Sequence, residues 1–195
     1  MSVVRVITGI LVVPLAFSAC GGGATPPASP EPAAVAAATP NSQVLMQLRA
    51  DWESQKDTMM KIADAMPEGK FSYKTTPAQR NYGEQIMHVA TANVELLKVL
   101  AGKAAAPAFT AESAKTKPDM LKALGESYDY GTALLNELTE STILEPVKDP
   151  PSFLGPSSRA RIVWTLLAHS MDIYGQMAVY LRLNGIVPPA SRGGV

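Results

Sequence analysis

The stretch that decides the fold is residues 169–192, HSMDIYGQMAVYLRLNGIVPPASR. Apolar residues and one of the chain's two histidines recur here and just upstream at steps of three and four, which places them on one helix face. This stripe consists of Leu166, His169, Ile173, Met177 and Tyr180. Gly185 follows the periodic run, and Pro188 and Pro189 come after it, in the usual order of residues at a helix end. The segment therefore predicts a long core-facing helix with a defined stop.

Three more amphipathic segments precede this helix. Together with it, they predict helices over about residues 42–66, 77–101, 117–139 and 159–184. The predicted N-caps are Asn41 or Ser42, Thr76, Thr116, and Ser157 or Ser158. Four such helices with no strand signal between them indicate an all-α four-helix bundle. The connections before the third and fourth helices are long enough to cross the bundle.

Composition excludes several classes of function. The formal net charge is zero and the charged fraction is low. Nothing in the sequence suggests the basic stripe that a nucleic-acid surface needs, so no nucleic-acid partner is expected. The sequence contains no serine nucleophile elbow, no phosphate-binding loop and no dinucleotide fingerprint. The single cysteine, Cys20, cannot form an intramolecular disulfide.

The position of Cys20 indicates a role outside the folded domain. Residues 1–19 carry one early positive charge and then an apolar run over residues 6–17, the pattern of a signal peptide. The run ends in Phe17-Ser18-Ala19-Cys20, which resembles a bacterial lipobox. That resemblance implies cleavage before Cys20 and lipid attachment to its sulfur. The alternative is an ordinary signal peptide that happens to end beside a cysteine.

The following residues fit a tethered protein of the cell envelope. Residues 20–42 are rich in Gly, Ala and Pro and predict a disordered tether, and residues 43–192 form the predicted domain. A lipid on Cys20 would make the membrane the expected partner. Gly21 rather than aspartate follows the cysteine, so sorting rules imply the periplasmic face of the outer membrane in a host with two membranes.

The end of the chain resembles the DinB/YfiT-like family. The matching residues are Tyr174, Gly175, Gln176, Tyr180, Leu181, Arg182, Gly185, Pro188, Pro189, Ala190 and Ser191. A second match, around the other histidine, is residues 83–90, GEQIMHVA. The resemblance covers residues 43–192 and implies an up-down-down-up bundle with a crossover connection.

Family members typically bind a divalent metal with three histidines, and the resemblance assigns two of them. His88 corresponds to the ligand on the second helix, and His169 to the first of two ligands on the last helix. Where the family places its third histidine, this chain has Ile173, which cannot coordinate a metal. Asp172 and Glu84 are the carboxylates close enough in sequence to act as substitutes, which would give a two-histidine, one-carboxylate site.

Two functions follow as hypotheses. One is an envelope lipoprotein with a degenerate metal site, no bound cofactor and a binding or structural role. The alternative is a metal-dependent hydrolase or thiol-dependent transferase that uses Zn, Ni or Fe held by His88, His169 and a carboxylate. The sequence identifies no small-molecule ligand, and it leaves open whether the domain forms a homodimer.

Overall fold

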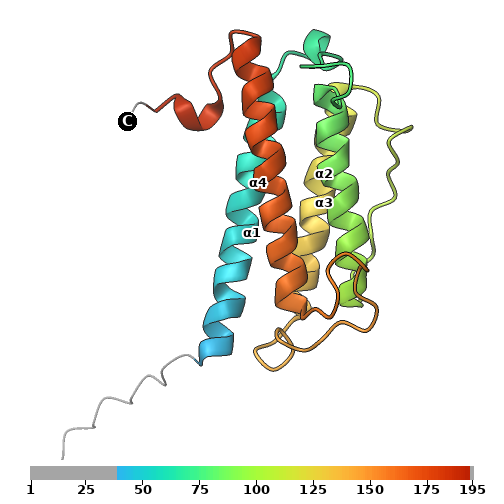
Figure 1. Ribbon diagram of the computed structural model, residues 1–195. Coiled ribbons are helices and arrows are strands. Elements are labelled where there is room, and N and C mark those ends of the chain that lie inside the picture. The colour runs from blue at the N-terminus through green and yellow to red at the C-terminus, as the bar shows by residue number, and fades with distance from the viewer. Residues whose placement is uncertain (1–38, 194–195) are drawn as a thin grey trace, which may run out of the picture. The chain divides into compact units, whose positions relative to one another are not determined.

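A computed structural model describes residues 39–193, and four long helices make up most of this part of the chain (Figure 1). They are α1 (Pro40–Ala65), α2 (Tyr82–Leu97), α3 (Lys117–Glu137) and α4 (Arg159–Leu183). Three single-turn 3-10 helices accompany them, namely η1 (Glu68–Lys70), η2 (Lys98–Leu100) and η3 (Pro189–Ser191). Within residues 39–193 the only β pairing is one bridge between Pro146 and Ser158. The predicted all-α four-helix bundle is therefore confirmed.

The helices run up, down, down and up, as Figure 1 shows. The connection between α2 and α3 returns along the length of the bundle, so it is the crossover implied by the family resemblance. Helix α1 packs against α3 and α4, and α2 packs against the same two helices. As a consequence, α4 has two different neighbours: the antiparallel α2 on one side and the parallel α1 on the other.

The start of the first helix lies slightly upstream of its predicted position. Thr39 is the N-cap, and its Oγ1 accepts a hydrogen bond from the Ser42 backbone N–H at 3.2 Å. Pro40 occupies the first helical position, where its missing N–H costs nothing. The predicted caps Asn41 and Ser42 are therefore wrong, and residues 40–42, assigned to the tether, form the first turn of α1.

The second helix begins later than the sequence predicted. Thr76 caps a single turn, in which the Gln79 N–H donates to the Thr76 carbonyl at 3.1 Å, and α2 starts only at Tyr82. Its cap is Asn81, which forms a capping box with Glu84: the Glu84 N–H donates to Asn81 Oδ1 and the Asn81 N–H donates to Glu84 Oε2, each at 2.7 Å.

Tertiary contacts explain this choice between two local start signals. The backbone N–H groups of Tyr82 and Gly83 donate to the carbonyls of Tyr73 and Phe71 in the preceding loop, at 3.2 and 3.0 Å. The Tyr82 hydroxyl donates to the Ile62 carbonyl at the end of α1. A helix that started at Pro77 would take these groups away from their partners, so the fold selects the Asn81 cap.

The caps of the last two helices are as predicted. Thr116 and Asp119 form a capping box at the start of α3, and Ser158 caps α4. At the end of α4, Gly185 adopts φ +70°, and the Ile186 N–H donates to the Leu181 carbonyl at 2.9 Å. This left-handed turn is the predicted helix stop. No helix within residues 39–193 combines the length and the apolar character that a membrane span requires.

The core is centred on Trp52, which is fully buried on α1. Its indole N–H donates to the Tyr128 carbonyl on α3 at 2.9 Å, and the two aromatic rings lie 4.9 Å apart. The indole lies directly against Gly131 of α3: a Cβ added there would come within 2.2 Å of the ring. Glycine at this position therefore lets α1 and α3 approach closely.

Candidate functional site

The two histidines meet between α2 and α4. His88 Nε2 and His169 Nε2 lie 3.0 Å apart, and the rings are 4.8 Å apart with an angle of 71° between their planes. Both side chains are partly buried. The family resemblance assigned both histidines to one site, and the structure brings them together. At this distance one ring donates a hydrogen bond directly to the other.

The surroundings of His169 assign the donor. Its Nδ1 is buried and has no hydrogen-bond partner among the described residues. If His169 accepted through Nε2, Nδ1 would carry an unpaired buried N–H, which is costlier than an unpaired acceptor. We therefore assign the proton to His169 Nε2, which donates to His88 Nε2 and leaves the His88 Nδ1–H facing away from the contact.

Burial and nearby positive charge lower the pKa of both rings, which favours their neutral forms. Desolvation is the main cause that lowers the pKa of His88 below its usual 6.5, and Arg80 and His169 add to the shift. Desolvation also lowers the pKa of His169; Asp172 opposes this effect and Arg80 reinforces it. Two protonated rings would both be donors and would repel each other, so the direct contact requires at least one neutral histidine.

This arrangement predicts acid-sensitive stability. The unfolded histidines titrate near pH 6.5 and the folded ones below it, so the unfolded chain binds more protons as the pH falls through this window. The contribution of the pair is fully present above about pH 6.5 and is lost as the pH falls towards the folded pKa values. Denaturant unfolding at a series of pH values should show this loss.

The control variant removes every histidine. The chain has two histidines, so the double variant His88→Gln, His169→Gln has none to titrate. Its unfolding free energy should depend less on pH between about 7 and 5 than that of the wild type. Identical pH slopes for the two proteins would show that the pair has the same pKa values folded and unfolded.

A polar strip continues from the histidines along the α2–α4 contact. Gln85 is fully buried, and its Nε2 donates to Gln176 Oε1 at 2.8 Å. Gln176 Nε2 in turn donates to Asp172 Oδ2 at 3.0 Å. Gln85 Oε1 has no partner among the described residues. The strip links the two segments that carried the family resemblance, GEQIMH on α2 and YGQ on α4.

The side chains around the histidine pair do not complete a catalytic metal site. Ile173, one turn after His169 on α4, is 2% exposed and offers only hydrocarbon. Asp172 accepts the bond from Gln176, and Glu84 is held in the α2 capping box. No group of three or more His, Cys, Asp or Glu side chains within residues 39–193 is arranged to hold a metal ion. A catalytic zinc site normally has three protein ligands, so this donor set does not fit one.

Comparison with known proteins agrees with the fold. The family model described as the DinB superfamily matches residues 51–177. The chain belongs to the DinB superfamily. No curated protein matches the sequence.

Two solved structures share the fold of this DinB chain. A DinB-like protein from Bacillus cereus ATCC 10987 has a TM-score of 0.65 at 18% identity, covering 74% of this chain and 95% of that one. A DinB-like protein from Bacillus subtilis, YjoA, has a TM-score of 0.55 at 16% identity, covering 71% of this chain and 92% of that one. At these identities the likeness establishes the four-helix architecture.

A pocket of about 300 Å³ opens on the α2 side of the DinB histidine pair. It is lined by Arg80, Glu84, Met87, His88, Thr91 and Ala111. Ala111 belongs to the crossover connection, so this connection forms one wall of the pocket. A neutral His88 in such a pocket can exchange hydrogen bonds with a ligand, while Arg80 supplies positive charge.

The residues that follow the matched stretch have a structural role. The Tyr180 hydroxyl donates to the Arg80 carbonyl in the loop before α2, at 2.5 Å. Arg182 Nη2 donates to Ser191 Oγ at 3.3 Å, which connects the end of α4 to η3. These contacts give Tyr180, Arg182 and Ser191 a structural role in this chain.

No signal in the sequence marks Gln85 or Gln176 as site residues. Both stand in the matched motifs, but an amide has no distinctive spacing rule, so only its burial and its partner reveal its role. A groove between α1 and α4 that contains Gln55 and Trp164 was also missed. The signal in the sequence was that Trp164, a large apolar residue, lies outside the apolar stripe of its helix.

Proposed function

We propose that this protein is a lipid-anchored DinB-domain protein of the bacterial envelope, with a degenerate two-histidine metal site and a binding or structural role. One observation carries the second half of the proposal: His88 and His169 bond to each other at 3.0 Å, with the aliphatic Ile173 in the family's third-ligand position. The hydrogen bond uses the same Nε2 atoms that would face a shared metal ion.

The chemistry of this arrangement favours binding over catalysis. Two neutral imidazoles hold a divalent cation weakly, because a third protein ligand is missing. A buried isoleucine instead adds apolar burial, which stabilises the bundle. A site that does not hold a metal firmly lacks a Lewis acid and a metal-activated water, so hydrogen bonding and recognition are the roles that we propose for it.

The envelope half of the proposal rests on the N-terminal sequence. Residues 1–38 lie outside the described part of the structure, so the predicted signal peptide, Cys20 and most of the tether are proposals from sequence alone. The support is that the chain's single cysteine falls directly after Phe17-Ser18-Ala19, where a lipobox requires it. The predicted address is the outer membrane, on its periplasmic face, in a host with two membranes.

Replacing Cys20 by Ser tests the anchor. The Cys20→Ser variant cannot accept the lipid at the cysteine sulfur, so it should either leave the membrane fraction or remain as the unprocessed precursor. Cell fractionation and intact-mass spectrometry measure both outcomes. A variant that stays membrane-bound with the wild-type processing pattern and no lipid mass difference would contradict the proposal.

An Ile173→His variant tests the degenerate site. It restores the i, i+4 histidine pair on α4 and leaves His88 and His169 in place. If Ile173 is the reason for weak metal binding, the variant should gain metal-dependent stability that the wild type lacks. Stoichiometric zinc, nickel or iron firmly bound to the wild type would instead favour the metal-dependent enzyme.

A further inference from the structure

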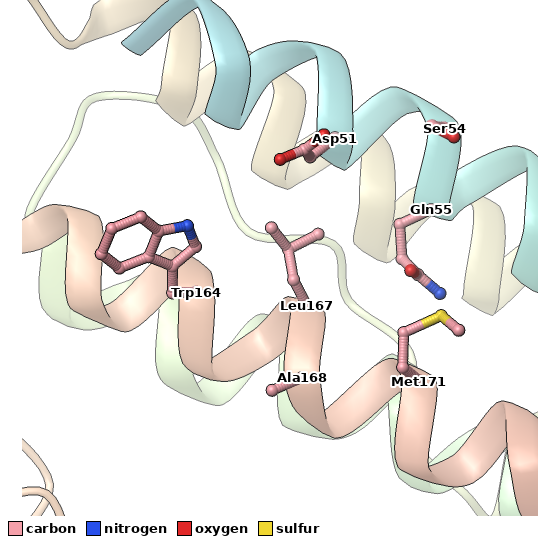
Figure 2. Close-up of a pocket in the computed structure, with 7 residues that line it drawn as sticks. All are labelled: Asp51, Ser54, Gln55, Trp164, Leu167, Ala168 and Met171. Carbon is pink, nitrogen blue, oxygen red and sulfur yellow. The ribbon is translucent and has the colours of Figure 1, made fainter. Parts of the chain in front are cut away.

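A groove of about 560 Å³ runs between the parallel helices α1 and α4 (Figure 2). It is lined by Asp51, Ser54, Gln55, Trp164, Leu167, Ala168 and Met171. The histidine pair lies at the other contact of α4, with α2, so the groove is a separate feature and does not depend on whether a metal binds.

The α4 wall of the groove is apolar and partly exposed. Trp164, Leu167 and Met171 stand at positions i, i+3 and i+7, and Figure 2 shows them along one side of the groove. Trp164 is 57% exposed and Met171 is 49% exposed. A flat tryptophan face and a flexible thioether form a suitable surface for an aromatic or branched apolar group.

Gln55 supplies an unsatisfied polar atom in this apolar setting. The residue is only 8% exposed, and its Nε2 is buried without a hydrogen-bond partner among the described residues. Figure 2 shows its amide reaching from α1 into the groove, with the nitrogen facing the Met171 thioether. A buried donor without a partner is costly, so an acceptor atom that reached it would be favoured. The flexible, half-exposed Met171 side chain can move to admit one.

The charge of the groove disfavours negatively charged ligands. Asp51 is the only ionisable residue among those that line it. Its carboxylate stands on the α1 side, where it would repel an anion and tolerate a neutral or cationic molecule. The ligand therefore needs an acceptor without a full negative charge, such as the carbonyl of an amide.

We infer that the α1–α4 groove is a binding site for a small aromatic molecule that carries an uncharged carbonyl-type acceptor. The apolar body would lie on Trp164 and Leu167, with the acceptor at Gln55 Nε2. A partner helix that docked an apolar face fits these observations less well, because its backbone groups are bonded internally and its apolar side chains would leave the Gln55 donor without an acceptor. The site goes beyond the proposed function, which concerns the histidine pair.

The two tryptophans of the chain make the inference directly measurable. Trp164 lies in the groove, whereas Trp52 is fully buried and bonded to Tyr128. The full chain, kept in solution with phosphatidylcholine nanodiscs, is titrated with para-tert-butylbenzamide while tryptophan emission is recorded. We expect a saturable change in emission that is absent from Trp164→Phe, which retains only Trp52.

A charged analogue of the amide and a variant of Gln55 test which contacts hold the ligand. Para-tert-butylbenzoate has the same body but a full negative charge, and it should bind about tenfold more weakly than the amide or not at all. Gln55→Met keeps the size of the side chain without the donor, and it should weaken amide binding by up to about tenfold.

Three results would overturn the inference. The first is that Trp164 emission shows no saturable response to the amide. The second is that Gln55→Met binds the amide as tightly as the wild type. The third is that the mass of the protein doubles with concentration, that this doubling changes Trp164 emission, and that the amide does not reverse it. The last result would show that a second copy of the chain occupies the groove. None of these results bears on the histidine site, so the proposed function would stand or fall separately.

Discussion

Gly131→Ala should destabilise the protein by about 3 kcal/mol, although alanine is the better helix former. The new Cβ would lie 2.2 Å from the Trp52 indole, and this ring is fully buried and bonded to the Tyr128 carbonyl. It cannot move away without breaking that bond or displacing its neighbours in a close-packed core. Denaturant unfolding followed by circular dichroism measures the loss directly.

Gly125→Ala is the matched control on the same helix. Its Cβ would meet only the flexible end of Met60 at 4.0 Å, so the substitution should be neutral or stabilise by up to about 1 kcal/mol. A Trp52→Phe change in the Gly131→Ala background removes the indole atoms that collide, so the double variant should lose less than the sum of the two single losses. Additive losses, or equal effects at Gly125 and Gly131, would show that the close approach is not what requires glycine.

Ile173→His should give the protein a metal-dependent stability that the wild type lacks. Residues 169 and 173 lie one helical turn apart on α4, and His88 Nε2 is already within 3.0 Å of His169 Nε2. A metal that binds only the folded state at 100 times its Kd adds about 2.7 kcal/mol to the unfolding free energy. We therefore expect a zinc-dependent rise in melting temperature for the variant and little change for the wild type.

Two controls separate metal binding from a change in polarity. Ile173→Gln places a polar side chain at the same buried position without an imidazole, and it should show no zinc-dependent stabilisation. His88→Ala in the Ile173→His background should remove the gain, because it leaves only the two ligands on α4. If zinc stabilised the wild type and Ile173→His equally, the wild type would already have a third ligand, and Asp172→Ala and Glu84→Ala would identify it.

Local sequence signals predicted most of the fold. The helix at residues 159–184, its Ser158 cap and its stop at Gly185 follow from periodicity, a short polar side chain and a left-handed glycine, all of which act within a few residues. The same local reasoning failed at Thr76, since two caps compete within six residues and the contacts of Tyr82 with Tyr73 and Ile62 decide between them. A preference worth about 1 kcal/mol cannot outweigh several tertiary hydrogen bonds.

The candidate site was also predicted only in part from the sequence. The identity of the residues was available from the sequence. His169 stood on an inward stripe, and the family resemblance added His88 as a second ligand and Ile173 at the position of the third. The direct Nε2–Nε2 bond, the Gln85–Gln176 link beside it and the unpartnered Gln55 donor in the α1–α4 groove depend on where separate helices meet. The periodicity of apolar residues predicts which face of a helix turns inward. It does not predict which neighbouring helix that face will contact. That choice is made by side-chain packing between helices, so only the tertiary structure could decide it.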